Sequence, residues 1–94
     1  MRRSQVEMYV DILGVLARSG PLKLTGVMQN ANIIYSMLRK CLDFLTKQGL
    51  VEVKMIGEEK EVYVITQLGV TVLEQFRELR EVLPKVVETG AQII

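Results

Sequence analysis

The sequence predicts a mainly α-helical (α+β) fold, and two patterns carry this prediction. Between residues 33 and 66, an amphipathic helix leads into a short strand, a charged turn and a second short strand. From residue 67 onward, apolar residues recur with the spacing of one long helix. A helix-turn-helix followed by a β-hairpin, the wing, is a winged helix-turn-helix. We therefore expect this fold at residues 1–66, followed by a C-terminal coiled-coil dimerisation helix and tail at residues 67–94.

Length and composition favour a small binding protein over an enzyme. The 94 residues are 49% hydrophobic, enough for one core and for additional apolar surface that a partner covers. With no histidine and a single cysteine, the chain cannot build a Ser-His-Asp triad, an imidazole metal site or an internal disulfide. We interpret Cys41 as an inert, half-buried thiol rather than a reactive one. The sequence predicts no catalytic residue, no metal site, no cofactor and no small-molecule substrate.

The sequence does not predict a membrane segment or an export signal. No apolar run approaches the ~18 residues that a membrane-spanning helix needs. The N-terminal Met-Arg-Arg-Ser leads into an amphipathic stretch that carries Glu7 and Asp11, unlike the apolar region of a signal peptide. We expect a cytoplasmic, nucleoid-associated protein without a membrane partner.

The first helix is predicted to begin after Ser4 and to end at Gly20. Ser4 and Glu7 fit a capping box, in which each side chain accepts a hydrogen bond from the backbone N–H of the other residue. Apolar residues then follow with a period of 3.6 residues. Gly20 and Pro21 end the helix, because glycine adopts the left-handed cap and proline cannot continue the helix.

Two short elements are expected before the third helix. The alternation at residues 22–24 predicts a short strand that pairs with the wing. Thr25 is expected to cap a brief second helix that runs to about Asn30. Ala31 and Asn32 then form the turn, since asparagine tolerates the left-handed backbone.

The third helix is predicted from about Ile34 to Gln48, with Gly49 at its end. Its core face has apolar residues at i, i+3, i+4 and i+7, namely Leu38, Cys41, Leu42 and Leu45. Its opposite face carries Ser36, Arg39, Lys40, Asp43 and Lys47. Long polar and cationic side chains are what a recognition helix needs to reach bases and phosphates in the major groove. The alternative is an ordinary solvated helix, on which Asp43 forms i,i+4 ion pairs with Arg39 and Lys47.

The wing is predicted as two strands, Val51–Ile56 and Glu61–Ile65, joined by a turn at residues 57–60. Its charged side chains are mostly acidic: Glu52, Glu58, Glu59 and Glu61 against Lys54 and Lys60. The carboxylates near the tip fit a solvated turn better than a metal site or an acid–base pair. Because phosphate repels carboxylates, we expect this wing to contact DNA poorly.

A long helix is predicted from Gln67 to Leu83, with Thr66 as its N-cap. Its apolar residues recur close to the 3.5-residue repeat of a coiled coil, at Leu68, Val72, Phe76, Leu79, Leu83 and Val86. At roughly 25 Å, this helix is longer than a 66-residue body covers. We expect a homodimer interface formed by Val72, Phe76, Leu79, Leu83 and Val86. The alternative packs the helix onto the first helix of its own chain. Pro84 is expected to kink or end it, leaving residues 85–94 as a short extra turn and a tail.

The two halves of the chain carry opposite charge. Residues 1–49 hold seven basic and three acidic side chains, a balance of +4, whereas residues 50–94 hold five basic and eight acidic ones, a balance of −3. The helix-turn-helix half is therefore expected to face a polyanion. The isoelectric point near 7.8 is low for a nucleic-acid-binding domain, so affinity should be modest or depend on the two sites of a dimer.

Several motifs resemble those of the archaeal ten-kilodalton winged-helix DNA-binding proteins, over roughly residues 2–83. Residues 28–35, MQNANIIY, are similar to the run that joins the second and third helices in that family. Residues 63–69, YVITQLG, are similar to the run that joins the wing to the tail helix. The resemblance implies dimerisation through an antiparallel coiled coil of the last helices, and DNA binding as a chromatin-type protein or transcription regulator. The sequence departs from the family at Gly26, Gln29 and Ile34, where a basic residue, a tyrosine and a capping serine are usual.

The expected function is binding of double-stranded DNA by a homodimer. Arg39 and Lys40 are expected to contact the major groove, with Tyr35 and Ser36 at the entrance of the third helix. Flanking phosphates are expected to contact Arg2, Arg3, Lys23 and Lys47. The main alternative is a winged-helix protein-interaction module, whose acidic wing and apolar tail bind a protein partner.

Overall fold

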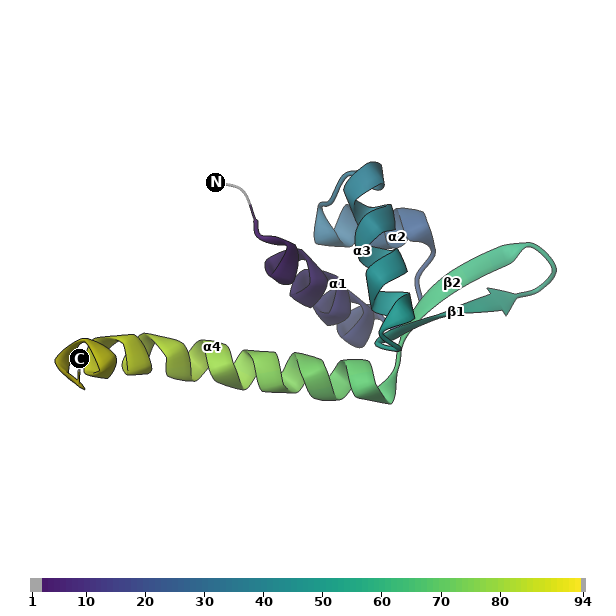
Figure 1. Cartoon of the computed structure of the whole chain (residues 1–94). Helices are drawn as coiled ribbons and strands as arrows, with labels where there is room; N and C mark the ends of the chain where they lie inside the picture. Colours follow the sequence, from purple (N-terminus) through teal and green to yellow (C-terminus); the bar gives the residue numbers. More distant parts are fainter. Residues whose placement is uncertain (1–2, 94) are drawn as a thin grey trace.

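The computed structural model describes residues 3–93, with side chains described through residue 83. In chain order its elements are α1 (Gln5–Ser19), α2 (Leu24–Ala31), α3 (Tyr35–Lys47), β1 (Val51–Ile56), β2 (Lys60–Ile65) and α4 (Gln67–Ile93). The first three helices form a body from which the β-hairpin projects on one side, while α4 runs along α1 and leaves the body on the other side (Figure 1). This arrangement confirms the predicted mainly α-helical winged helix-turn-helix.

The core lies where α1, α2 and α3 meet the base of the hairpin and the first turns of α4. Its largest fully buried side chains are Ile12, Leu13, Leu16, Val27, Leu38, Leu42, Leu45, Val51 and Leu73. The apolar stripes predicted for the first and third helices supply most of this set. Each leucine so buried contributes about 1.5–3 kcal/mol to folding, so these stripes fix how the helices pack.

Local signals set the ends of α1 as predicted. The Glu7 N–H donates to the Ser4 hydroxyl at 3.1 Å, and the Ser4 N–H donates to the Glu7 carboxylate at 3.3 Å, which completes the capping box. At the other end, Gly20 has a φ of 79° and donates its N–H to the carbonyl of Leu16 at 2.9 Å. Such a positive φ is a conformation that glycine adopts without strain.

The segment between α1 and α2 differs from the prediction. The expected strand at residues 22–24 is reduced to one antiparallel bridge, in which Leu22 exchanges both backbone hydrogen bonds with Tyr63. The second helix begins at Leu24, so its N-cap is Lys23 and not Thr25. The reason is that Leu24 packs against the core, which requires the chain to turn helical immediately after the bridge. The predicted turn is confirmed, since Asn32 caps α2 in the left-handed conformation at φ 55°.

The wing is a two-stranded antiparallel sheet whose register pairs Val51 with Ile65 and Ile56 with Lys60. Its base is tied to the start of α4 by Thr66. The Thr66 hydroxyl donates to the Gly49 carbonyl at 2.7 Å and accepts the Gly69 N–H at 3.0 Å, which confirms Thr66 as the N-cap of α4. We call this contact between residues 49–50 and 66–69 the wing–tail joint.

The last helix was expected to kink or end at Pro84, and the expected end is wrong, because α4 continues to Ile93. A proline inside a helix removes one backbone hydrogen bond, here the bond to the carbonyl of Arg80. Residues 80–83 are exposed, so water can hydrate that carbonyl and the helix continues past the proline.

Replacing Gly69 by alanine is expected to destabilise the protein strongly. A Cβ atom there would overlap the carbonyl oxygen of Leu50 and stand 2.7 Å from Cγ1 of Ile65, so the wing–tail joint would have to open. We expect a loss of at least about 2 kcal/mol in the free energy of unfolding, measured in urea.

Gly14→Ala is the matched control for this substitution. A Cβ atom at Gly14 meets only the end of the Arg77 side chain at 3.6 Å, an ordinary contact. Because alanine is the better helix former, Gly14→Ala should leave stability unchanged or raise it by up to about 1 kcal/mol. Equal effects of the two substitutions would show that the joint is not closely packed.

Candidate nucleic-acid interface

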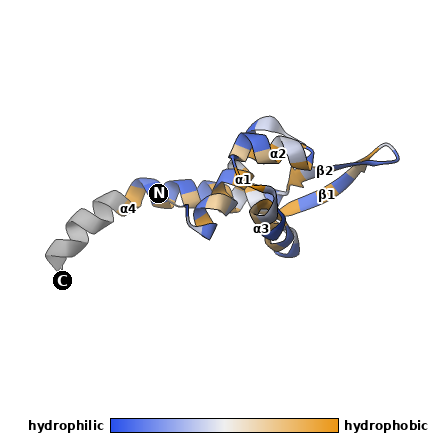
Figure 2. Ribbon diagram, turned by 90° about the horizontal axis from the view of Figure 1, so that it is seen from above, coloured by the Kyte–Doolittle hydropathy of each residue, from blue (hydrophilic) through white to orange (hydrophobic). Residues whose placement is uncertain are grey.

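The outward face of α3 is the first part of the candidate interface. Leu38, Cys41, Leu42 and Leu45 are buried, which confirms the predicted core face of this helix. Ser36, Lys40, Asp43 and Lys47 are exposed on the other side. Figure 2 shows the hydrophilic side of α3 facing away from the body. The helix therefore presents a polar and mostly cationic surface to the solvent.

Arg39 was predicted on the solvent face of α3, opposite the core, but the structure shows it half-buried and turned toward the wing. Its Nη1 donates to the hydroxyl of Tyr63 in β2 at 2.9 Å, and its Nη2 lies 3.4 Å from the Asp43 carboxylate. Its side chain is 40% exposed. The Tyr63 phenol, and to a lesser degree Asp43, hold the pKa of Arg39 above its usual value, so the guanidinium stays charged. Arg39 thus braces α3 against the wing while its remaining N–H groups face the solvent.

The predicted phosphate contacts fall into three groups. Lys23 and Lys47 are exposed, and within residues 3–83 neither they nor Lys40 forms an ion pair or a side-chain hydrogen bond. Arg3 is engaged inside the protein, as described next. Arg2 lies outside the described residues. The lysines are therefore the side chains most available to phosphate.

Arg3 ties the start of α1 to the turn before α3. Its Nη1 donates to the Asp11 carboxylate at 2.9 Å and to the Ala31 carbonyl at 2.8 Å, and its Nη2 donates to the Asn32 carbonyl. No local pattern predicts this role, because the contacts join residues 8 to 29 positions apart. Whether Arg3 also reaches phosphate stays a prediction.

The leading end of α3 carries two exposed apolar side chains, of which Tyr35 was predicted as a site residue from the sequence and Ile34 was not. Ile34, the N-cap, is 72% exposed, and Tyr35 is 56% exposed. The first turn contains no acidic residue and no side-chain cap. The signal was available in the sequence, since Ile34 stands where a capping serine is usual. Tyr35 and Ser36 lie at the helix entrance, where they were placed by prediction.

The wing is acidic, as predicted, and also apolar. Outside its first residue every side chain of β1 is exposed, including Val53, Met55 and Ile56 at 43%, 55% and 54%. These three residues do not enter the core. They give the hairpin an exposed apolar strip that its charge alone did not predict.

The tail helix is divided into a covered part and an exposed part. Leu73 is buried, and Val72 and Phe76 pack half-buried against the core of their own chain. Further along, Leu79, Val82 and Leu83 are 50%, 49% and 44% exposed. Of the predicted dimer residues, Val72 and Phe76 therefore bury part of their surface within their own chain, whereas Leu79 and Leu83 remain about half exposed. The side chain of Val86, the fifth predicted residue, lies outside the described side chains.

Other kinds of site find no support in the part of the chain that the structure describes. Its titratable side chains form no group of three that could hold a metal ion, and none of its helices is long and apolar enough to cross a membrane. Cys41 is fully buried rather than half-buried as expected, and this burial raises the pKa of its thiol. A buried thiol in its neutral form is a poor nucleophile, in line with the inert role expected for it.

Comparison with known proteins agrees with this geometry. A family model described as winged helix-turn-helix matches residues 2–84. The chain belongs to this winged helix-turn-helix family. It is similar to Sso10a-2, a DNA-binding protein from Sulfolobus solfataricus, with 29% identity, a TM-score of 0.72 and coverage of 98% of this chain and 97% of that one. The resemblance to the archaeal ten-kilodalton proteins is thereby confirmed.

Two further solved structures share the fold of this chain. A transcriptional regulator from Clostridium thermocellum is 24% identical with a TM-score of 0.73, covering 86% of this chain and 89% of its own. MepR, a transcription regulator of a Staphylococcus aureus multidrug efflux pump, is 13% identical with a TM-score of 0.74, covering 88% and 63%. At these identities the likeness shows the fold alone. A search of curated proteins gives no significant match.

Tyr63→Phe is expected to weaken the brace between α3 and the wing. The substitution keeps the buried ring but removes the oxygen that accepts the Arg39 hydrogen bond. Because Arg39 is partly solvated, we expect a loss of only about 0.5–1 kcal/mol in the free energy of unfolding, measured in urea. Tyr35→Phe removes an exposed hydroxyl and should have no effect. A loss as large for Tyr35→Phe would contradict the assigned role of the brace.

Proposed function

We propose that this protein is a homodimer that binds double-stranded DNA by placing α3 in the major groove, and that it has no catalytic role. The observation that carries the proposal is the exposed cationic face of α3, where Lys40 and Lys47 have no partner within the described residues. An α-helix fits the major groove, which is about 12 Å wide. Lysines without an internal partner can neutralise phosphates without breaking existing contacts.

Within this interface the side chains have different roles. Lys40 and Arg39 contact base edges or phosphates in the groove, while Lys23 and Lys47 contact phosphates on either side. Arg39 is already oriented by Tyr63, at 2.9 Å, so it loses less conformational freedom on binding. Ile34 and Tyr35 lead the helix into the groove, where an apolar side chain can contact the C5 methyl group of thymine.

Dimerisation through α4 is supported by the exposed stripe of Leu79, Val82 and Leu83. These residues lie past the part of α4 that packs on the body, so a second α4 is the surface that fits them. A symmetric dimer presents two copies of α3 and doubles the phosphate contacts. Such a protein acts as a nucleoid-associated chromatin protein or a transcription regulator.

The second candidate is a protein-interaction module that uses the wing. It is favoured by the exposed Val53, Met55 and Ile56 on an acidic hairpin, which suit an apolar, cationic partner better than DNA. The two candidates predict different behaviour of the purified protein toward bare DNA, which the next experiment tests.

Binding to random-sequence duplex DNA should depend steeply on salt. If four cations per protomer each neutralise one phosphate, log K falls against log[salt] with a slope of about −7 for the dimer, measured by fluorescence anisotropy. Lys40→Gln with Lys47→Gln removes two contacts per protomer and should reduce the slope by about half. Lys54→Gln with Lys60→Gln, the same charge loss on the wing, should change it little. Absence of binding at about 50 mM salt would refute DNA binding and favour the wing module.

Two charges on the exposed stripe should separate the protomers. Leu79→Glu with Leu83→Glu forces two carboxylates into any helix–helix interface, at a cost that exceeds the about 1.5–3 kcal/mol each buried leucine contributes. Sedimentation should then show a folded monomer. In the anisotropy titration, the slope of log K for DNA against log[salt] should fall to about half that of the unmodified protein. Gln67→Glu with Thr71→Glu adds the same charge off the stripe and should remain dimeric. A monomeric unmodified protein at micromolar concentration would rule out this interface.

Contact between Ile34 and thymine should make binding sensitive to the thymine methyl group. Replacing thymine by deoxyuridine in an A·T-rich duplex should weaken binding about threefold to fourfold per contacted methyl, since one buried methyl group is worth about 0.8 kcal/mol. Ile34→Ala should bind the two duplexes equally. Val6→Ala, at an exposed apolar site on α1, should keep the difference. If the unmodified protein binds both duplexes equally, Ile34 does not read thymine even though DNA binding stands.

A further inference from the structure

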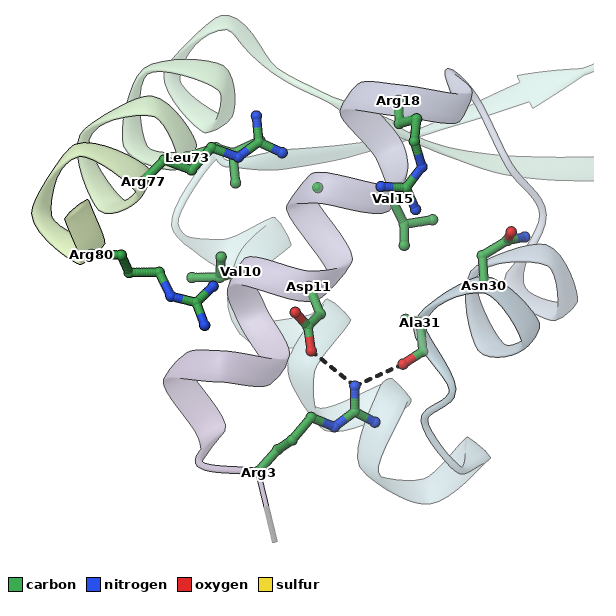
Figure 3. Close-up of a pocket in the computed structure, with 11 residues that line it drawn as sticks. Arg3, Val10, Asp11, Val15, Arg18, Asn30, Ala31, Leu73, Arg77 and Arg80 are labelled. Atoms are coloured by element: carbon green, nitrogen blue, oxygen red, sulfur yellow. Dashed lines mark hydrogen bonds and ion pairs between the residues drawn. The ribbon is translucent and has the colours of Figure 1, made fainter. Parts of the chain in front are cut away.

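A hollow of about 310 Å³ lies between α1, the end of α2 and α4, away from the outward face of α3. Its floor is apolar and buried, formed by Val10, Val15 and Leu73. Around this floor stand the side chains of four arginines, with Arg3 and Arg18 at the two ends of α1 and Arg77 and Arg80 on α4 (Figure 3). We call these residues the arginine hollow.

The hollow carries an unbalanced positive charge. Asp11 is the single carboxylate among its lining residues, and it is already paired with Arg3 at 2.9 Å. Within residues 3–83, Arg18, Arg77 and Arg80 form no ion pair and donate no hydrogen bond to a protein group. Guanidinium groups that converge on one space repel each other, and an anion between them would offset this repulsion.

Two of these arginines lie against neighbouring groups of the protein. Arg77 lies across α1 at Gly14, where its Nη2 would be 3.6 Å from an added Cβ atom, so a large side chain at this position would displace it. The guanidinium of Arg80 lies over the ring of Phe76, 6.0 Å from its centroid. Two positive charges on the α4 side of the hollow therefore have neighbouring contacts before any ligand arrives.

We propose that the arginine hollow is a binding site for a small oxyanion, a carboxylate or a phosphate. Guanidinium groups match the two oxygens of such a group with parallel hydrogen bonds, and charge-assisted bonds of this kind are strong. The volume is at the lower end of the range for small-molecule sites, which favours a small ligand. The site is separate from the DNA-binding face of α3.

Arg3 links the hollow to the recognition helix. The same guanidinium that lines the hollow donates to the carbonyls of Ala31 and Asn32, the turn directly before α3. An oxyanion that replaces the two carbonyls as the acceptor of these Arg3 hydrogen bonds would release this turn. Occupation of the hollow should therefore lower the affinity of α3 for DNA, and DNA should lower the affinity for the anion by the same factor.

The test is calorimetric titration of the full chain with pyrophosphate and with succinate, at constant ionic strength. We expect saturable binding of at least one anion, and the preferred one identifies the ligand as a phosphate or a carboxylate. Arg77→Gln with Arg80→Gln should weaken this binding at least about tenfold. Lys54→Gln with Lys60→Gln, an equal charge loss on the wing, should leave it unchanged. If circular dichroism shows that the double variant does not fold, Arg18→Gln alone replaces it and should likewise weaken anion binding.

Three outcomes would overturn the proposal. The first is absence of binding of both anions at millimolar concentration. The second is equal weakening by the wing variant, which would show non-specific charge attraction. The third combines two observations: the Arg77→Gln, Arg80→Gln variant is a monomer, and the unmodified protein is a dimer that binds neither anion. These arginines would then form ion pairs with carboxylates of a second copy. Because the titration contains no DNA, its failure is distinguishable from failure of the proposed DNA binding.

The link to α3 has its own measurement. Pyrophosphate should weaken binding of the unmodified protein to duplex DNA at constant ionic strength, and should do so less in the Arg77→Gln, Arg80→Gln variant. An equal effect on both proteins would show that the anion competes at the DNA-binding lysines, and would refute the link through Arg3.

Discussion

The wing–tail joint is the contact on which the rest of the structure depends. The Thr66 hydroxyl donates to the Gly49 carbonyl at 2.7 Å, and the Thr66 N–H donates to the Leu50 carbonyl at 3.0 Å. Gly69 lies against the same carbonyl of Leu50, where a Cβ atom has no room. The Thr66 hydroxyl and these few backbone atoms fix the end of α3, the base of the wing and the start of α4 relative to one another. The directions in which wing and tail leave the body follow from this contact.

Because α4 leaves the joint along α1, one helix performs two tasks. Its first turns complete the core through Leu73, while Leu79 and Leu83 remain half exposed farther along. The coiled-coil repeat in the sequence is therefore longer than the part of α4 that remains available to contact another chain. The first part of the repeat stabilises the chain itself, and the part that continues past the body stays exposed on the single chain.

The charge of the N-terminal half is likewise divided between structure and surface. Arg3 holds the turn before α3, and Arg39 braces α3 against Tyr63. Arg18 faces the arginine hollow on the side of α1 and α4. Among the described cations of this half, the lysines at positions 23, 40 and 47 are the ones left free for phosphate. The surplus of +4 in residues 1–49 thus overstates the charge available to DNA on the face of α3.

The sequence by itself determined the features that depend on neighbours along the chain. The capping box of Ser4 and Glu7, the left-handed turn at Asn32 and the cap at Thr66 each involve residues within a few positions, as do the apolar stripes of the helices. Tertiary structure decided the rest, because it depends on residues distant in sequence. The start of α2 at Leu24 limited the expected strand to its bridge at Leu22, and the hydroxyl of Tyr63 turned Arg39 toward the wing. Packing of α4 on α1 assembled the arginine hollow. Solvent along the exposed part of α4 let the helix pass Pro84, which a local rule had placed at its end.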